Sequence, residues 1–110
     1  GQYFYIVNTT KKQYLHPHDF GDRLKMGEFN STMEVLALLL AIPILQVLHP
    51  LIGTWKGDAI TIAGDYPEES FTCDGQEFSN TREASQELFE RISQSKEFQD
   101  LHKAWDALFE

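Results

Sequence analysis

The chain has 110 residues, of which 42% are hydrophobic and 24% are charged. This size and composition predict one globular domain spanning residues 1–110 and exclude a disordered chain. The single cysteine excludes an internal disulfide, and the net charge of −8 argues against direct binding to nucleic-acid phosphates. From the lone cysteine and the lack of a basic, apolar leader we expect a cytoplasmic protein.

The first 15 residues have the pattern of a β-hairpin. An aromatic-rich run over residues 3–7 and a second short run over 12–15 are separated by a polar turn. In an extended strand Tyr5 and Val7 lie on one face and Ile6 lies on the other. Because both faces are apolar, we expect the first strand to be central and covered on both sides.

A helix is predicted next in the chain. Ser31 and Glu34 match a capping box, and the helix should continue through Val35–Ala41 until Pro43 kinks or ends it. The apolar stretch Val35–Leu48 is hydrophobic nearly all round, which indicates a central core helix or an oligomer interface. It is too short to span a bilayer, so no membrane partner is expected.

The second half of the chain supplies the remaining elements. Residues 59–63 predict a third strand. Residues 64–79 show neither the hydrophobic period of a helix nor that of a strand, which predicts a long loop. Apolar stripes over 84–92 and 98–108 predict one or two acidic helices. The fold class is therefore α+β: a small antiparallel sheet, made of the hairpin and the strand near 59–63, packed with a central apolar helix and the C-terminal helices.

The corner after the hairpin holds the candidate metal ligands. His16 and His18 are two residues apart and can bind Zn²⁺ or a similar divalent metal if a further ligand completes the shell. Asp22 is our preferred third ligand, with Asp19 and His49 as other candidates. The alternative is that the two histidines are hydrogen-bonded scaffolding and the protein holds no cofactor.

Three Gly-Asp pairs, at residues 21–22, 57–58 and 64–65, recur along the chain. Paired carboxylates serve acid–base chemistry or metal binding when they converge. The preferred interpretation is turn chemistry, in which the glycine takes a positive φ and the carboxylate caps nearby backbone.

The acidic loop over residues 66–78 is the candidate surface for a protein partner. The whole net charge of −8 comes from residues 53–110, since the charges of residues 1–52 cancel. Aromatic anchors within a charged rim are typical of protein-binding surfaces, although the aromatic side chains would also serve to tie the loop to the core. We therefore predict a partner with a basic surface, the alternative being that the acidic residues only keep the chain in solution. The predicted partner-binding residues are Tyr66, Glu68, Glu69, Phe71, Asp74 and Glu77.

Two stretches resemble a family of small bacterial and phage proteins to which no activity is assigned. They are Gly1–Asp22, with Gln-Tyr-Phe-Tyr-Ile-Val-Asn and Tyr-Leu-His-Pro-His, and Gly53–Tyr66, with Trp-Lys-Gly-Asp and Ile-Ala-Gly-Asp-Tyr. The resemblance implies a bacterial or phage origin and supplies no catalytic residue. We favour a small acidic protein-binding module without catalysis, such as a phage-encoded inhibitor or regulator of a host defence protein. The alternatives are a small metal-dependent enzyme with a His/Asp site and a homo-oligomeric structural protein that uses the Val35–Leu48 helix.

Overall fold

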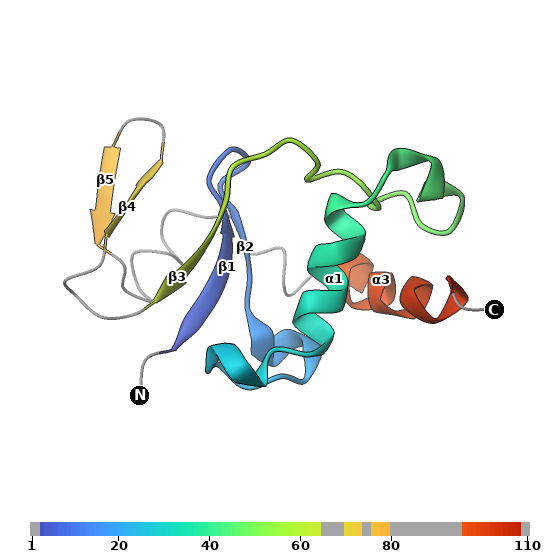
Figure 1. Cartoon of the computed structure of the whole chain (residues 1–110), viewed down its shortest axis with the longest axis horizontal. Coiled ribbons are helices and arrows are strands. Elements are labelled where there is room, and N and C mark those ends of the chain that lie inside the picture. Colours follow the sequence, from blue (N-terminus) through green and yellow to red (C-terminus); the bar gives the residue numbers. More distant parts are fainter. Residues whose placement is uncertain (1–2, 65–69, 74–75, 80–95, 109–110) are drawn as a thin grey trace.

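The structure is a computed structural model that describes residues 3–64, 70–73, 76–79 and 96–108, with the backbone alone for 70–73, 76–79 and 96–97. It has the predicted α+β architecture (Figure 1). The strands are β1 (Phe4–Asn8), β2 (Gln13–Leu15), β3 (Ile60–Gly64), β4 (Ser70–Cys73) and β5 (Gln76–Ser79). The α-helices are α1 (Ser31–Leu40) and α3 (Lys96–Ala107), and the 3₁₀ turns are η1 (Pro17–Phe20), η2 (Met26–Glu28) and η3 (Pro43–Val47).

The main sheet has three antiparallel strands in the order β2-β1-β3. Val7 of β1 lies opposite Tyr14 on one side and Thr61 on the other. The turn between β1 and β2 ends at Lys12, which takes a positive φ of 58°. The prediction of a central first strand is confirmed, and hydrophobic residues on both of its faces are buried.

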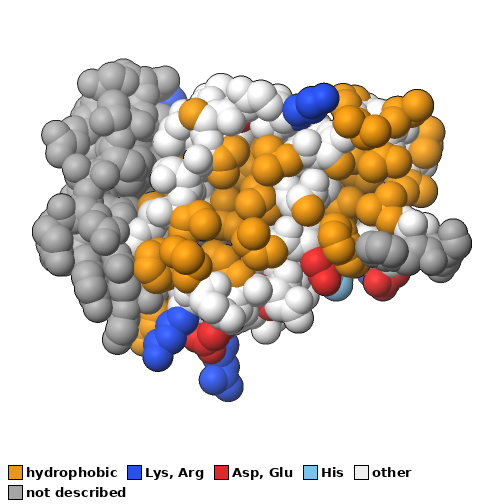
Figure 2. Space-filling view, in the orientation of Figure 1, with side chains coloured by type: hydrophobic (Ala, Val, Ile, Leu, Met, Phe, Trp, Pro, Cys, Tyr) orange, Lys and Arg blue, Asp and Glu red, His pale blue; other side chains and the backbone are white. Residues whose placement is uncertain are grey.

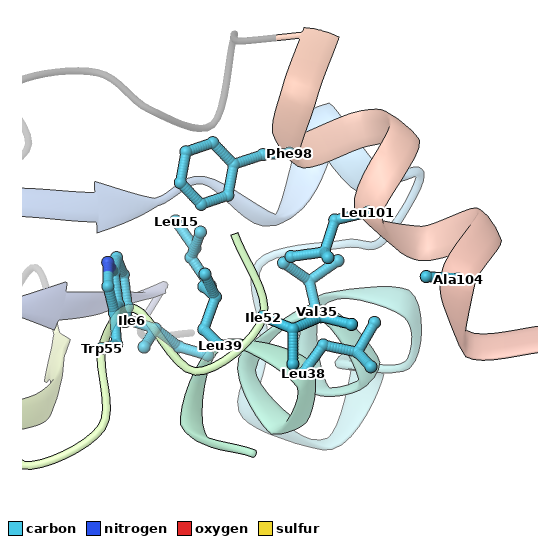
Figure 3. Packing of buried hydrophobic residues seen from close by; sticks show 10 residues of the cluster. All are labelled: Ile6, Leu15, Val35, Leu38, Leu39, Ile52, Trp55, Phe98, Leu101 and Ala104. Carbon is cyan, nitrogen blue, oxygen red and sulfur yellow. The ribbon is translucent and has the colours of Figure 1, made fainter. Parts of the chain in front are cut away.

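The larger core lies between one face of this sheet, α1 and α3 (Figure 3). Phe98, Leu101 and Ala104 recur every three residues along α3, so one face of that helix packs into the core, as its apolar stripe predicts. Trp55 fills the space beside the sheet and donates its Nε1–H to Oε1 of Gln13 at 3.2 Å. The buried members of this cluster are Ile6, Leu15, Val35, Leu38, Leu39, Ile52, Trp55, Phe98, Leu101 and Ala104.

A second, smaller cluster covers the opposite face of the sheet. Tyr5 and Val7 of β1 meet Tyr14 of β2 there, together with Ala63 of β3. Leu24 closes the cluster from the loop after η1, and its carbonyl accepts a hydrogen bond from the Phe4 N–H at 2.8 Å. The loop between η1 and α1 is thereby tied to the first residue of the central strand β1.

Two of the predicted segments differ from the structure. The apolar stretch Val35–Leu48 is not one helix, because α1 ends at Leu40 and a separate 3₁₀ turn begins at Pro43. Proline has no N–H to continue the α-helical ladder, which explains the break. Part of the expected loop over 64–79 is a hairpin, in which β4 pairs with β5 in a second sheet.

The predicted stripe over 84–92 lies outside the described residues. None of the helices within the described ranges has the length and hydropathy needed to cross a bilayer.

Candidate functional sites

His16 forms the base of the predicted metal corner. It is 4% exposed and precedes η1, and its Nδ1 accepts a hydrogen bond from the His18 N–H at 3.2 Å. The edge of its ring packs against Tyr5 with centroids 5.1 Å apart, while the ring of the exposed His18 lies 5.0 Å away. The ring of His16 therefore joins η1 to the sheet, which is the scaffolding role considered for it above.

Asp22, in the loop before α1, caps the N-terminus of that helix. Its carboxylate accepts hydrogen bonds from the backbone N–H groups of Asn30 at 2.8 Å, Ser31 at 3.2 Å and Thr32 at 2.7 Å. These are N–H groups that a helix leaves without intrahelical partners. Partial burial opposes ionisation of Asp22, but the backbone hydrogen bonds outweigh burial and lower its pKa below the ordinary 3.8.

The predicted capping box is therefore replaced by a longer-range contact. α1 does begin at Ser31, but the residue before it, Asn30, makes no side-chain capping bond, and Asp22 takes that role. Glu34 pairs with Nε2 of His102 on α3. The helix start could be predicted from the sequence, whereas the group that stabilises it lies too far along the chain to be identified by local spacing.

The three predicted metal ligands are not gathered at one point. Within the described part of the chain, no group of three or more His, Cys, Asp or Glu side chains is placed to hold a metal ion. Asp22 is directed to the N-terminus of α1, while His16 and His18 remain neighbours on η1. A Zn²⁺ site formed by His16, His18 and Asp22 stays a prediction, which calorimetry can test.

A recess lies where η1 meets α3. It has a volume of about 220 Å³ and is lined by Asp19, Phe20, Gln99 and His102. Oδ2 of Asp19 is buried without a hydrogen-bond partner, and the amide of Gln99 donates to the Asp19 carbonyl at 3.4 Å. The recess therefore brings together the carboxylate of Asp19 and the imidazole of His102, two types of side chain that serve in acid–base chemistry. Local sequence patterns could not identify this recess, since its residues come from two distant segments.

A polar network joins the first hairpin turn to the start of β3. Asp58 accepts hydrogen bonds from the Lys11 ammonium and, at 2.9 Å, from the Asn8 amide, and these contacts lower the pKa of its carboxyl. Gly57 and Gly21 have positive φ values of 86° and 82°. The predicted positive φ is confirmed for the glycines of the pairs at 21–22 and 57–58. The carboxylates differ from the prediction: Asp22 caps backbone N–H groups of a later segment, and Asp58 binds the side chains of Asn8 and Lys11. Asp65 of the third pair lies outside the described residues.

The segment around η3 exposes aliphatic side chains to solvent. Ile44 and Val47 are 74% and 87% exposed, whereas Leu45 between them is partly buried against the core. Figure 2 shows hydrophobic side chains gathered over η3 and the loop beside it, at the upper right. We call this the η3 surface. It consists of Leu40, Ile42, Ile44, Val47 and Leu48.

Backbone contacts fix the η3 surface to the body of the protein. The N–H groups of Gly53 and Trp55 donate to the carbonyls of Leu38 and Leu39 at the end of α1, each at 3.0 Å. The Gln46 amide donates to the carbonyl of Ile52 at 2.8 Å. The segment that follows η3 is therefore tied to the end of α1, and the Gln46 side chain ties η3 to that segment.

Most of the predicted acidic surface cannot be placed. Tyr66, Glu68, Glu69 and Asp74 lie outside the described residues. Phe71 is in β4, opposite Phe78 of β5, and Glu77 is in β5, opposite Thr72; only their backbone is described. This surface stays a prediction.

Comparison with known proteins gives no match. No family model, curated protein sequence or solved structure matches the chain. Function is therefore argued from the residues of this chain.

Proposed function

We propose that this chain is a protein-binding module and that the η3 surface docks another protein chain. The observation that supports the proposal is the concentration of exposed aliphatic side chains, led by Ile44 and Val47, on an anchored backbone. Contiguous apolar patches on soluble proteins are frequently interaction sites. The Gln46 contact and the hydrogen bonds from the following segment to α1 reduce the ordering free energy that is lost on docking.

The size of the η3 surface sets the strength of binding that it supports. Its exposed fractions add up to about three fully exposed aliphatic side chains. Burying them contributes roughly 5–9 kcal/mol, at about 1.5–3 kcal/mol per side chain. Association costs about 4–15 kcal/mol in lost freedom. The aliphatic residues alone therefore support weak or moderate binding, and a tighter complex needs polar contacts around them.

The acidic loop over residues 66–78 is a second binding surface that we propose for the same module. The concentration of the net charge of −8 in residues 53–110 supports a partner with a basic surface. The role that we propose for such a module is a phage-encoded regulator that binds a host protein. Its support is the small size of the chain and its acidity.

The test of the η3 surface is a comparison of variants that differ only in where a charge is added. Tagged wild-type chain and an Ile44→Asp/Val47→Asp variant would be used to capture proteins from a bacterial lysate. Each captured protein would then be purified and titrated by calorimetry. Met26→Asp is the control, because Met26 is 47% exposed on η2, outside the η3 surface.

We expect the double variant to lose a partner that wild type and Met26→Asp both bind. The physical reason is that docking would bury the introduced carboxylates without a counter-charge. Equal affinities of all three proteins for every captured partner would contradict the proposed docking site.

A further inference from the structure

We propose that the chain docked on the η3 surface is a second copy of this protein. This inference rests on the proposed function, because it names the occupant of the same surface. It replaces the predicted pairing through a continuous Val35–Leu48 helix with pairing through the segment that follows α1.

The distribution of charge supports a second copy. Residues 35–55 contain no lysine, arginine, aspartate or glutamate, although the whole chain carries a net charge of −8. Two copies that meet through acidic regions would place like charges against one another, which opposes association. The η3 surface lies within the uncharged stretch, so its own segment brings no carboxylate into a contact between two copies.

The chemistry of the side chains also suits self-pairing. In a two-fold dimer the same patch appears on both sides, so it must be complementary to itself. Aliphatic side chains such as Ile44 and Val47 meet this condition because they need no partner of opposite charge or matching hydrogen-bond pattern. Leu45 faces the core of its own chain, which leaves its two exposed neighbours to form the contact.

The area of the η3 surface indicates a weak, concentration-dependent dimer. Its aliphatic side chains expose roughly 200–350 Å² of apolar area, while a standard interface covers about 800 Å² per partner. We place the aliphatic side chains at the centre of the contact, with the exposed, uncharged Pro43 and Gln46 beside them.

The test is sedimentation velocity on the purified full chain from about 1 μM to about 1 mM, the range in which a contact of this size changes occupancy. We expect wild type to shift from the single 12.7 kDa chain to a dimer as concentration rises. Val47→Asp should weaken the dimer about 30-fold or more, as expected for a central contact residue. Met26→Asp should dimerise like wild type. Circular dichroism should show that both variants fold.

A cross-link locates the contact independently. In a Cys73→Ser background, Val47→Cys should form a disulfide between two copies on mild oxidation, while Met26→Cys should not. A dimer that Val47→Asp leaves intact would overturn the inference, because the second copy would then bind elsewhere.

Wild type that stays monomeric at every concentration would also overturn the inference. In that case the capture experiment decides the proposed function separately. Loss of a different partner by the Ile44→Asp/Val47→Asp variant would leave the η3 surface as a docking site. Unchanged binding of every partner would remove both proposals.

Discussion

Replacing Asp22 tests whether one carboxylate stabilises the start of α1. Asp22→Ala removes the acceptor for the N–H groups of Asn30, Ser31 and Thr32. Loss of a capping acceptor costs about 0.5–2 kcal/mol, and loss of a negative charge at a helix N-terminus costs about 0.3–1 kcal/mol more. Since three donors lose their partner, we expect the free energy of unfolding to fall by about 2–3 kcal/mol. Asp22→Asn keeps one acceptor oxygen and should lose about half as much.

The measurement is urea denaturation followed by the fluorescence of Trp55 and Trp105, at pH 7 and at several lower pH values. The pKa of Asp22 is lower in the folded chain than its ordinary 3.8. The contribution of its charge is therefore complete above the pKa of the unfolded chain and is lost as the pH falls through the folded-state pKa. The stability gap between wild type and Asp22→Asn should be constant near neutral pH and close in acid.

Two results would refute this reasoning. One is an Asp22→Ala variant that matches wild type within about 0.5 kcal/mol at pH 7, the range of an ordinary surface substitution. The other is a gap between wild type and Asp22→Asn that stays the same from pH 7 down to strong acid. The first would mean that water satisfies the helix N-terminus as well as the carboxylate does, and the second that the contribution of Asp22 does not depend on its charge.

Further predictions concern packing and metal binding. Gly53→Ala should lower the free energy of unfolding by about 2–4 kcal/mol, because Gly53 has a positive φ and the new Cβ would lie 2.7 Å from the carbonyl oxygen of Ala41. Gly57 also has a positive φ but has open space around it, so Gly57→Ala should lower the free energy of unfolding by only about 1–2 kcal/mol. In the same urea assay, Leu101→Ala should cost about 2–5 kcal/mol, and Val47→Ala should stay within about 0.5 kcal/mol of wild type, because the first side chain is buried and the second is exposed. The metal hypothesis predicts saturable Zn²⁺ binding by calorimetry that is lost in His16→Ala; negligible heat with both proteins would remove it.

The elements with a clear local period were predictable from the sequence. Side chains of residues 3–7 point alternately to the two faces of a strand, and the structure buries Ile6 in one cluster and Tyr5 in the other. The spacing of Phe98 and Leu101 identified the buried face of α3. These predictions succeed because a regular backbone fixes which side chains share a face.

Contacts between distant segments could not be predicted in the same way. Glu34 fits a capping box in sequence, yet it pairs with His102, because the packing of α3 against α1 brings that imidazole to it. Hydrophobicity also did not distinguish the partly buried side of η3, which carries Leu45, from the exposed side that carries Val47. Each of these outcomes depends on the tertiary arrangement.

The position of β1 has a consequence for synthesis of the chain. Its partner β2 follows within a few residues, but β3 and the carboxylate that binds the Asn8 amide come some 50 residues later. On the ribosome the hairpin therefore emerges before β3 can pair with β1, and an unpaired strand edge invites aggregation. We expect nascent chains that stop before Ile60 to be captured by chaperones, and full-length chains to be released once β3 has emerged and covered that edge.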